Sequence, residues 1–153
     1  KPVTEEKKTR ISAFAQSIAD QPIELLPGVA DTIAILAQRH RCILVTKGDE
    51  LEQRDKLRRS GLEPHFAAVE VLPEKKEAAF RALSRHHRLD HTCTWMIGNS
   101  PRSDINPALA AGLNAVFIPH DTTWVLEDEA IDRPPTGQHL LELTTFPDLT
   151  RHF

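Results

Sequence analysis

The sequence predicts an α/β fold, with a Rossmann-like three-layer α/β/α arrangement around a parallel sheet. Three observations predict it: short apolar runs alternate with amphipathic helical patterns, glycines stop several of the helices, and polar residues directly follow the apolar runs. Strands that alternate with helices in this way form a parallel sheet. The 153 residues, 40% of them hydrophobic, suffice for one compact domain with its own core.

The alternation can be followed from one end of the chain to the other. The predicted helices cover residues 4–19, 28–38, 49–60, 74–87 and 103–111. The predicted strands cover residues 43–46, 67–72, 92–97 and 115–118. Asp49 and Glu52 have the spacing of a capping box, and Gly61 and Gly112 end helices. Beyond Pro119 the pattern weakens, and LLELTTF is either a late strand or coil.

The composition excludes several classes of partner. The 22 acidic and 19 basic residues are well mixed and give a net charge of −3, which favours neither nucleic acid nor an anionic membrane. No apolar stretch approaches the roughly 20 residues that span a bilayer. Cys42 and Cys93 each lie inside an apolar run, so we expect two buried free thiols and a cytoplasmic protein.

Candidate functional residues follow three predicted strands. Parallel strands deliver the residues at their C-terminal ends to one edge of the sheet, where helix N-termini attract anions. The three segments supply a hydroxyl, ammonium groups and a carboxylate to that edge. In chain order they are Thr46-Lys47-Gly48-Asp49, then Pro73-Glu74-Lys75-Lys76, then Gly98-Asn99-Ser100-Pro101-Arg102-Ser103-Asp104.

The order of these segments resembles the haloacid dehalogenase superfamily of hydrolases. Its second, third and fourth motifs are a strand-terminal Ser or Thr, a Lys and an acidic cluster, here Thr46, Lys75 and GNSPRSDINPALAAG. The resemblance implies phosphoryl transfer with Thr46, Lys75 and Asp104 as catalytic residues. Thr46, Lys47, Gly48 and Lys75 would hold phosphate, and Asn99 and Asp104 would hold Mg²⁺. Phosphoryl transfer asks mainly for positioning and positive charge around the phosphoryl oxygens, which agrees with these residue types.

The sequence departs from the family pattern in two places. The family's nucleophile belongs to an Asp-x-Asp motif after an apolar strand, and these 153 residues contain none. Residues 1–20 therefore resemble the last helix of a cap domain, and residues 21–153 resemble the core without its first strand. The other departure is Asn99, where many relatives have Asp. With one carboxylate fewer, the site should bind Mg²⁺ more weakly.

These observations leave three hypotheses open. The first is a Mg²⁺-dependent phosphatase, acting on a small phosphorylated metabolite through an aspartyl-phosphate whose Asp lies outside this chain. The second is a non-catalytic domain that binds phosphate or a partner, and the third is a 2-haloacid dehalogenase. A core without its first strand would expose strand edges, so a homodimer or completion by the missing N-terminal segment is also expected.

Two further groups of residues invite a functional interpretation. His86, His87 and His91 cluster near a predicted helix end, where a solvated end is favoured over a metal site because adjacent helical residues diverge. Lys47 and Arg102 flank the predicted phosphate edge and could meet a substrate anion, although exposure without a partner is the simpler expectation.

Overall fold

The computed structural model describes residues 7, 23–120 and 129–153. The sequence-predicted helix 4–19, and with it the proposed cap remnant 1–20, lies outside these residues apart from Lys7. The described helices are α2 (Val29–Ala37), α3 (Glu50–Ser60), α4 (Glu77–His87) and α5 (Asn106–Ala110). The strands are β1 (Ile43–Lys47), β2 (Ala68–Leu72), β3 (Trp95–Gly98), β4 (Asn114–Phe117) and β5 (Leu140–Glu142). Short helices cover η1 (Glu63–His65), η2 (Pro101–Ile105) and η4 (Phe146–Arg151).

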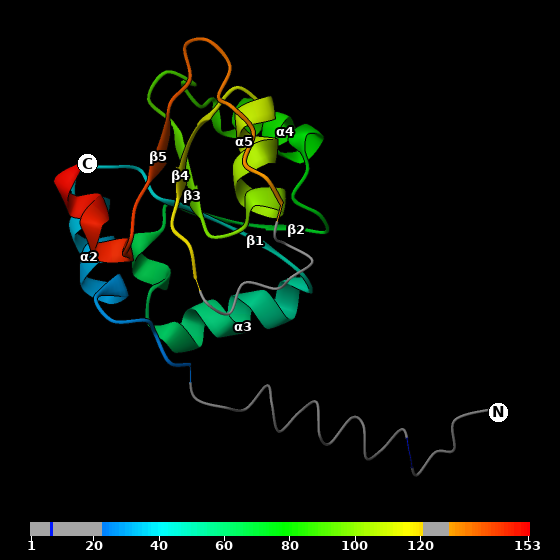
Figure 1. Cartoon of the computed structure of the whole chain (residues 1–153). Helices are drawn as coiled ribbons and strands as arrows, with labels where there is room; N and C mark the ends of the chain where they lie inside the picture. Colours follow the sequence, from blue (N-terminus) through cyan, green and yellow to red (C-terminus); the bar gives the residue numbers. More distant parts are fainter. Residues whose placement is uncertain (1–6, 8–22, 121–128) are drawn as a thin grey trace.

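All described strand pairs are parallel, as the sequence predicts, but the strands form two sheets. β1 pairs with β2, with Thr46 opposite Val71. β3, β4 and β5 form the second sheet in that order. The strands of the two sheets run in clearly different directions in Figure 1. Val45 of β1 and Met96 of β3 nevertheless pack against the same buried cluster, so the two sheets share a core.

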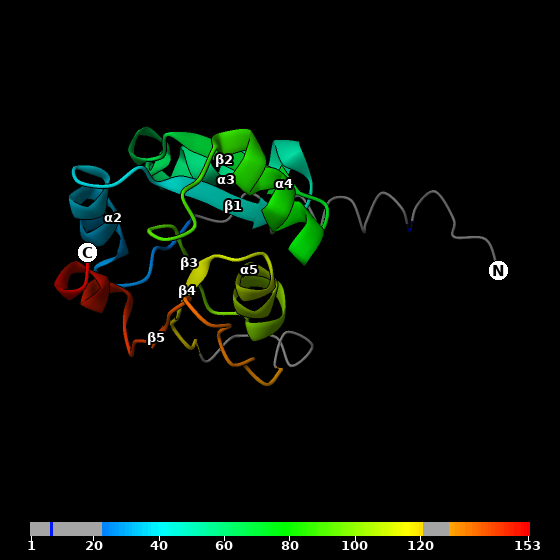
Figure 2. The same ribbon diagram turned by 90° about the horizontal axis from the view of Figure 1, so that it is seen from above.

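Helices cover both faces of these strands and complete the three layers. Neighbouring residues of a strand point to opposite faces, and Leu44 packs with α2 and α3 while Val45 packs with α4 and α5. In the second sheet Val116 packs with α2 and η4, and Ala115 packs with α5. Figure 2 shows β1 and β2 among α3 and α4, with β3 and β4 beside α5. The predicted α/β fold is therefore confirmed.

Helix α3 begins and ends where its sequence predicts. Asp49 has an extended backbone, and its side chain accepts a hydrogen bond from the Glu52 N–H, which satisfies one of the free donors at the helix start. Gly61 ends the helix with φ of 73°, a conformation that costs glycine little. The entry to α3 is thus fixed directly after Thr46-Lys47-Gly48.

Two elements, α4 and β3, begin three residues later than predicted, and one predicted helix differs in type at its start. α4 starts at Glu77 because Lys76 has an extended backbone. β3 starts at Trp95 because a turn precedes it, in which the Asp90 carboxylate accepts hydrogen bonds from the Thr92 N–H and hydroxyl. In the predicted helix 103–111, the π-helical turn η2 takes the first residues, and the α-helix α5 begins only at Asn106. The ambiguous segment near the C-terminus forms a strand, β5, followed by η4.

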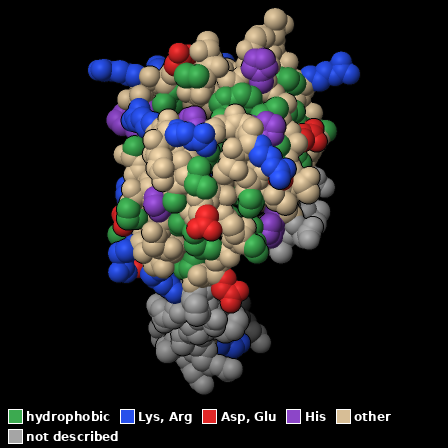
Figure 3. All heavy atoms as spheres, turned by 90° about the vertical axis from the view of Figure 1, so that its left-hand side faces the viewer, with side chains coloured by type: hydrophobic (Ala, Val, Ile, Leu, Met, Phe, Trp, Pro, Cys, Tyr) green, Lys and Arg blue, Asp and Glu red, His purple; other side chains and the backbone are tan. Residues whose placement is uncertain are grey.

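The surface agrees with the predicted mixed charge as far as the structure describes it. On the face that Figure 3 shows, basic, acidic and histidine side chains are interspersed among apolar ones. None of the helices in the described part of the chain is long and apolar enough to cross a membrane.

The expectation of two buried thiols is wrong for Cys93 and holds only in part for Cys42. Cys42 is half-buried, and burial raises the pKa of its thiol. Cys93 is exposed because it lies in the turn before β3. The thiolate is the reactive form, so we expect iodoacetamide to modify Cys93 well before Cys42 under native conditions. Peptide mass spectrometry of a time course would check this order, and equal rates at the two residues would contradict it.

Candidate active site

Thr46 and Lys47 are the last two residues of β1, and Gly48 turns the chain away from the sheet. The Gly48 N–H donates to the Leu72 carbonyl at 3.2 Å, which fastens the turn to the end of β2. Gly48 has φ of 136°, a region that side-chain-bearing residues rarely adopt. Thr46 is half-buried and its hydroxyl donates to Gln53 Oε1 at 2.9 Å.

Lys75 and Asp104 form an ion pair that is shielded from solvent. Lys75 Nζ lies 2.7 Å from Asp104 Oδ1, and the two side chains are 13% and 6% exposed. The other carboxylate oxygen, Oδ2, accepts a hydrogen bond from the Ser100 N–H at 3.1 Å. A charge this deeply buried needs a partner and hydrogen bonds. The Asp104 carboxylate is therefore held in one orientation by groups from two separate segments.

The loop that carries Asp104 winds into a π-helical turn. Ser100 caps this turn: its Oγ accepts from the Ser103 N–H, and its carbonyl accepts from the N–H groups of Asp104 and Ile105. Such turns are uncommon and often occur at functional sites. Ser100, Ser103 and Asp104 are all buried, whereas Asn99 is exposed at the end of β3. The turn thus presents one fixed carboxylate beside one accessible amide.

A second contact joins the two sheets at this edge. Lys47 Nζ donates to the Ser103 Oγ at 3.1 Å. Lys47 is exposed, as expected, but the expectation that it has no partner is wrong, because the π-helical turn brings Ser103 to it. Lys47 and Lys75 reach from the ends of β1 and β2 to the same turn after β3. The structure thus gathers the three predicted segments into one site.

Two residues of this site were missing from the sequence-based prediction. Ser103 bonds Lys47, and Gln53 bonds Thr46. Ser103 lies in the acidic segment and could have been found there as a hydroxyl one residue before Asp104. Gln53 lies in the first turn of α3, where the helical pattern alone marks a half-exposed polar position without indicating its partner.

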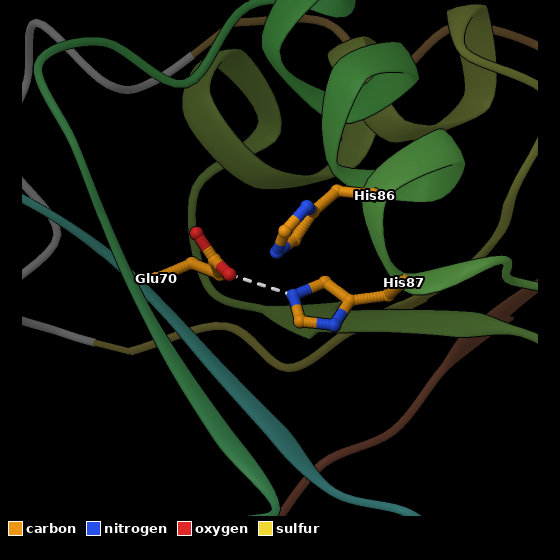
Figure 4. A group of neighbouring side chains, drawn as sticks. All are labelled: Glu70, His86 and His87. Carbon is orange, nitrogen blue, oxygen red and sulfur yellow. Dashed lines mark hydrogen bonds and ion pairs between the residues drawn. The ribbon is translucent and has the colours of Figure 1, made fainter.

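The described part of the chain also contains a second polar cluster, formed by Glu70, His86 and His87 (Figure 4). Their ligand-type atoms lie within 4.8 Å of one another. The expected solvated helix end is wrong for His87, whose side chain is 8% exposed and whose Nε2 lies 2.6 Å from Glu70 Oε1. Arg41 lies 3.1 Å from His87 Nδ1. Arginine can only donate, so Nδ1 accepts and Nε2 carries the proton toward Glu70. The adjacent guanidinium charge disfavours a metal ion on this ring, and the cluster instead joins β2 to the end of α4.

This interpretation predicts a stability effect that is specific to one of two neighbouring histidines. His87→Leu should lower the free energy of unfolding by about 1–2 kcal/mol, because it removes the nearly buried imidazole and leaves the partly buried Glu70 carboxylate without its donor. Urea denaturation would measure the change. His86→Leu is the matched control and should change stability by less than about 0.5 kcal/mol, because His86 is exposed. Equal losses in the two variants would contradict the assigned role of His87.

The fold and the site around Thr46, Lys75 and Asp104 define a class of protein: an α/β protein whose polar residues gather where parallel strands end. The family model described as haloacid dehalogenase-like hydrolase matches residues 3–112, which is more than two thirds of the sequence. The chain belongs to the haloacid dehalogenase-like hydrolase family, as its resemblance at Thr46, Lys75 and the GNSPRSD segment predicted.

Solved structures share this fold. A haloacid dehalogenase-like family hydrolase from Xanthomonas campestris is 27% identical with a TM-score of 0.81, and the match covers 98% of this chain and 62% of that one. The magnesium-bound HAD-hydrolase YfnB from Bacillus subtilis is 22% identical, with a TM-score of 0.70 and coverage of 98% and 73%. A predicted phosphoglycolate phosphatase from Haemophilus somnus is 20% identical, with a TM-score of 0.69 and coverage of 99% and 69%.

The activity of these relatives cannot be assigned directly to this protein. The chain spans 62% of the length of the Xanthomonas structure. No curated protein sequence matches it. The likeness to the two structures below 25% identity shows the fold alone. Family membership and fold are thus shown, and the reaction has to be argued from the residues of the site.

Proposed function

We propose that this protein is the core of a Mg²⁺-dependent phosphatase that hydrolyses the phosphate ester of a small metabolite. The observation that carries the proposal is the buried Lys75–Asp104 ion pair. The hydrogen bond from Lys47 to Ser103 connects the turn that carries Asp104 to the end of β1, where Thr46 lies. Ammonium, hydroxyl and carboxylate groups at the ends of parallel strands suit a phosphoryl group. The nucleophilic Asp of this family would come from a segment outside these 153 residues.

Each residue of the site has a definite part in this proposal. The Lys47 and Lys75 ammonium groups would offset the negative charge of the phosphoryl oxygens, and the Thr46 hydroxyl would donate a hydrogen bond to one of them. Gly48 leaves the turn after β1 without a side chain, so an oxygen could approach its backbone. These contacts need no change in the packing of the two sheets, because the three segments already meet through the Lys47–Ser103 and Lys75–Asp104 contacts.

The donors present in this chain fit a magnesium ion. Mg²⁺ prefers oxygen ligands, and this edge offers the Asp104 carboxylate, with its Oδ2 fixed by Ser100, and the Asn99 side-chain carbonyl. Bound there, the ion would neutralise charge on the phosphoryl group. Lys75 now bonds Asp104 Oδ1, so it would share or yield that oxygen. Because Asn99 stands where many relatives have a second Asp, the site has one carboxylate fewer and should bind Mg²⁺ more weakly.

The test is phosphate release by a longer form of the protein that carries the Asp-x-Asp strand of the family. Asp104→Ala should abolish release of phosphate from a generic aryl phosphate in the presence of Mg²⁺, because both the cation and Lys75 lose their carboxylate partner. Asp31→Ala is the control, since Asp31 is an exposed carboxylate on α2. Unchanged turnover in the Asp104 variant would overturn the proposal.

Asn99 favours a second candidate function, a domain that binds phosphate or a partner without catalysis. The exposed amide replaces a charged ligand at the position where the cation would sit. In this case the longer form should bind phosphate but release none from the aryl ester, and Asn99→Asp should strengthen Mg²⁺ binding measured by calorimetry. Release of phosphate by the unmodified longer form would decide for the phosphatase.

A further inference from the structure

Gln53 lies between the first turn of α3 and the end of β1, where it bonds the hydroxyl assigned to the phosphate. Thr46 Oγ1 donates to Gln53 Oε1 at 2.9 Å, and both side chains are half-buried. Asp49 caps α3 one turn earlier, which fixes the position of Gln53 relative to the strand. The contact therefore belongs to the ordered framework of the site.

A threonine hydroxyl has one proton to donate. In the described arrangement Gln53 Oε1 accepts that proton, so the hydroxyl cannot also donate to a phosphoryl oxygen. A carboxamide, however, has an acceptor and a donor of nearly equal size at its two ends. A half turn of the Gln53 carboxamide places Nε2 on Thr46 Oγ1, and the threonine proton is then free to point at an anion.

Gly48 provides the room for this exchange. A Cβ at position 48 would lie 3.2 Å from Gln53 Nε2, closer than most Cβ contacts, so a side chain there would press on the carboxamide. The Gln53 carboxamide thus lies beside the backbone of Gly48, in the turn that follows Thr46. We propose that Gln53 is a positioning residue that orients the Thr46 hydroxyl, and that its carboxamide turns over when a phosphate-type anion binds.

This inference rests on the proposed phosphate site, and a double-mutant cycle separates the two. Inorganic phosphate binding to the protein would be measured by calorimetry for the unmodified chain, Thr46→Val, Gln53→Leu and the double variant. A hydrogen bond to a charged group contributes about 1.5–3 kcal/mol, so Thr46→Val should weaken phosphate binding by about tenfold or more. Gln53→Leu should weaken phosphate binding about three- to tenfold, because leucine offers no hydrogen-bonding group to orient the Thr46 hydroxyl.

The decisive measurement is the effect of Gln53→Leu in the Thr46→Val background. Residues that act through one another give non-additive effects, so the second change should then alter phosphate affinity by less than about twofold. Gln38→Leu, an exposed glutamine at the end of α2, is the matched control and should bind phosphate normally.

The remaining outcomes overturn one proposal or both. A loss from Gln53→Leu that is fully retained in the Thr46→Val background would indicate general damage and overturn the positioning role. A normal Gln53→Leu affinity beside a weakened Thr46→Val would also overturn it, while leaving the phosphate site intact. No effect of Thr46→Val, or no phosphate binding by the unmodified protein, would overturn both.

Discussion

Lys75→Met is expected to lower the free energy of unfolding by about 3 kcal/mol and to abolish phosphate binding. The Asp104 side chain is 6% exposed, and its Oδ1 depends on Lys75 Nζ at 2.7 Å. Removing one partner of a buried pair leaves an uncompensated charge, which typically costs 3–5 kcal/mol, and the slight exposure of Lys75 places the expected cost near the lower end. Urea denaturation would measure the loss.

A second variant distinguishes the two consequences of this change. Lys75→Met combined with Asp104→Asn should recover most of the lost stability, because neither charge remains, yet phosphate binding should stay absent. Lys76→Met is the control: its ion pair with Glu74 has side chains that are 74% and 67% exposed, and such pairs contribute little. If Lys76→Met and Lys75→Met destabilise the protein equally, the buried pair does not have the role assigned to it.

Gly98→Ala is expected to be still more disruptive. Gly98 ends β3, and a Cβ there would overlap with Oδ2, Cγ and Cβ of Asp104. The overlap reaches Asp104 Cβ, which is attached to the backbone of the π-helical turn, so rotation of the side chain cannot relieve it. We expect a loss of about 3–5 kcal/mol, the range of severe overpacking and of a broken buried ion pair, with aggregation or poor folding as the visible result.

Gly61→Ala is an informative comparison for this variant. Gly61 has φ of 73°, and apart from its chain neighbours no atom of the described residues lies within 4 Å of the position that an alanine methyl group would take, so its replacement tests mainly backbone strain. The expected loss is about 1–2 kcal/mol. Thermal unfolding of the two variants should show a clearly larger effect at position 98. A smaller effect at Gly98 than at Gly61 would mean that Asp104 can move away easily.

The order of strands and helices followed from the sequence because local signals agree with the final packing. Apolar runs such as Ile43–Val45, helix caps such as Asp49 and stop glycines such as Gly61 act within a few residues. The errors in element bounds have local causes that compete with periodicity. The Asp90 turn delays β3, and the Ser100 cap begins a π-helical turn before the predicted helix.

The site residues divide in a similar way. That Thr46, Lys75 and Asp104 share one edge followed from the direction of parallel strands. The pairing of Lys47 with Ser103 and of His87 with Glu70 could not be predicted, because these residues are separated by 56 and 17 positions and no local pattern records the contact. The division of the strands into two sheets is likewise a property of the packed chain.

The two sheets bear on how the site comes into being. Each sheet is built from one continuous stretch of chain, residues 43–72 for the first and 95–142 for the second, so strand pairing closes short loops within each half. The site, in contrast, takes Thr46 and Lys75 from the first half and Asp104 from the second. The site is therefore complete only where the two halves are packed against each other. Molecules in which the halves have separated would lack the site, so the apparent affinity for an anion would follow the docked fraction of the population.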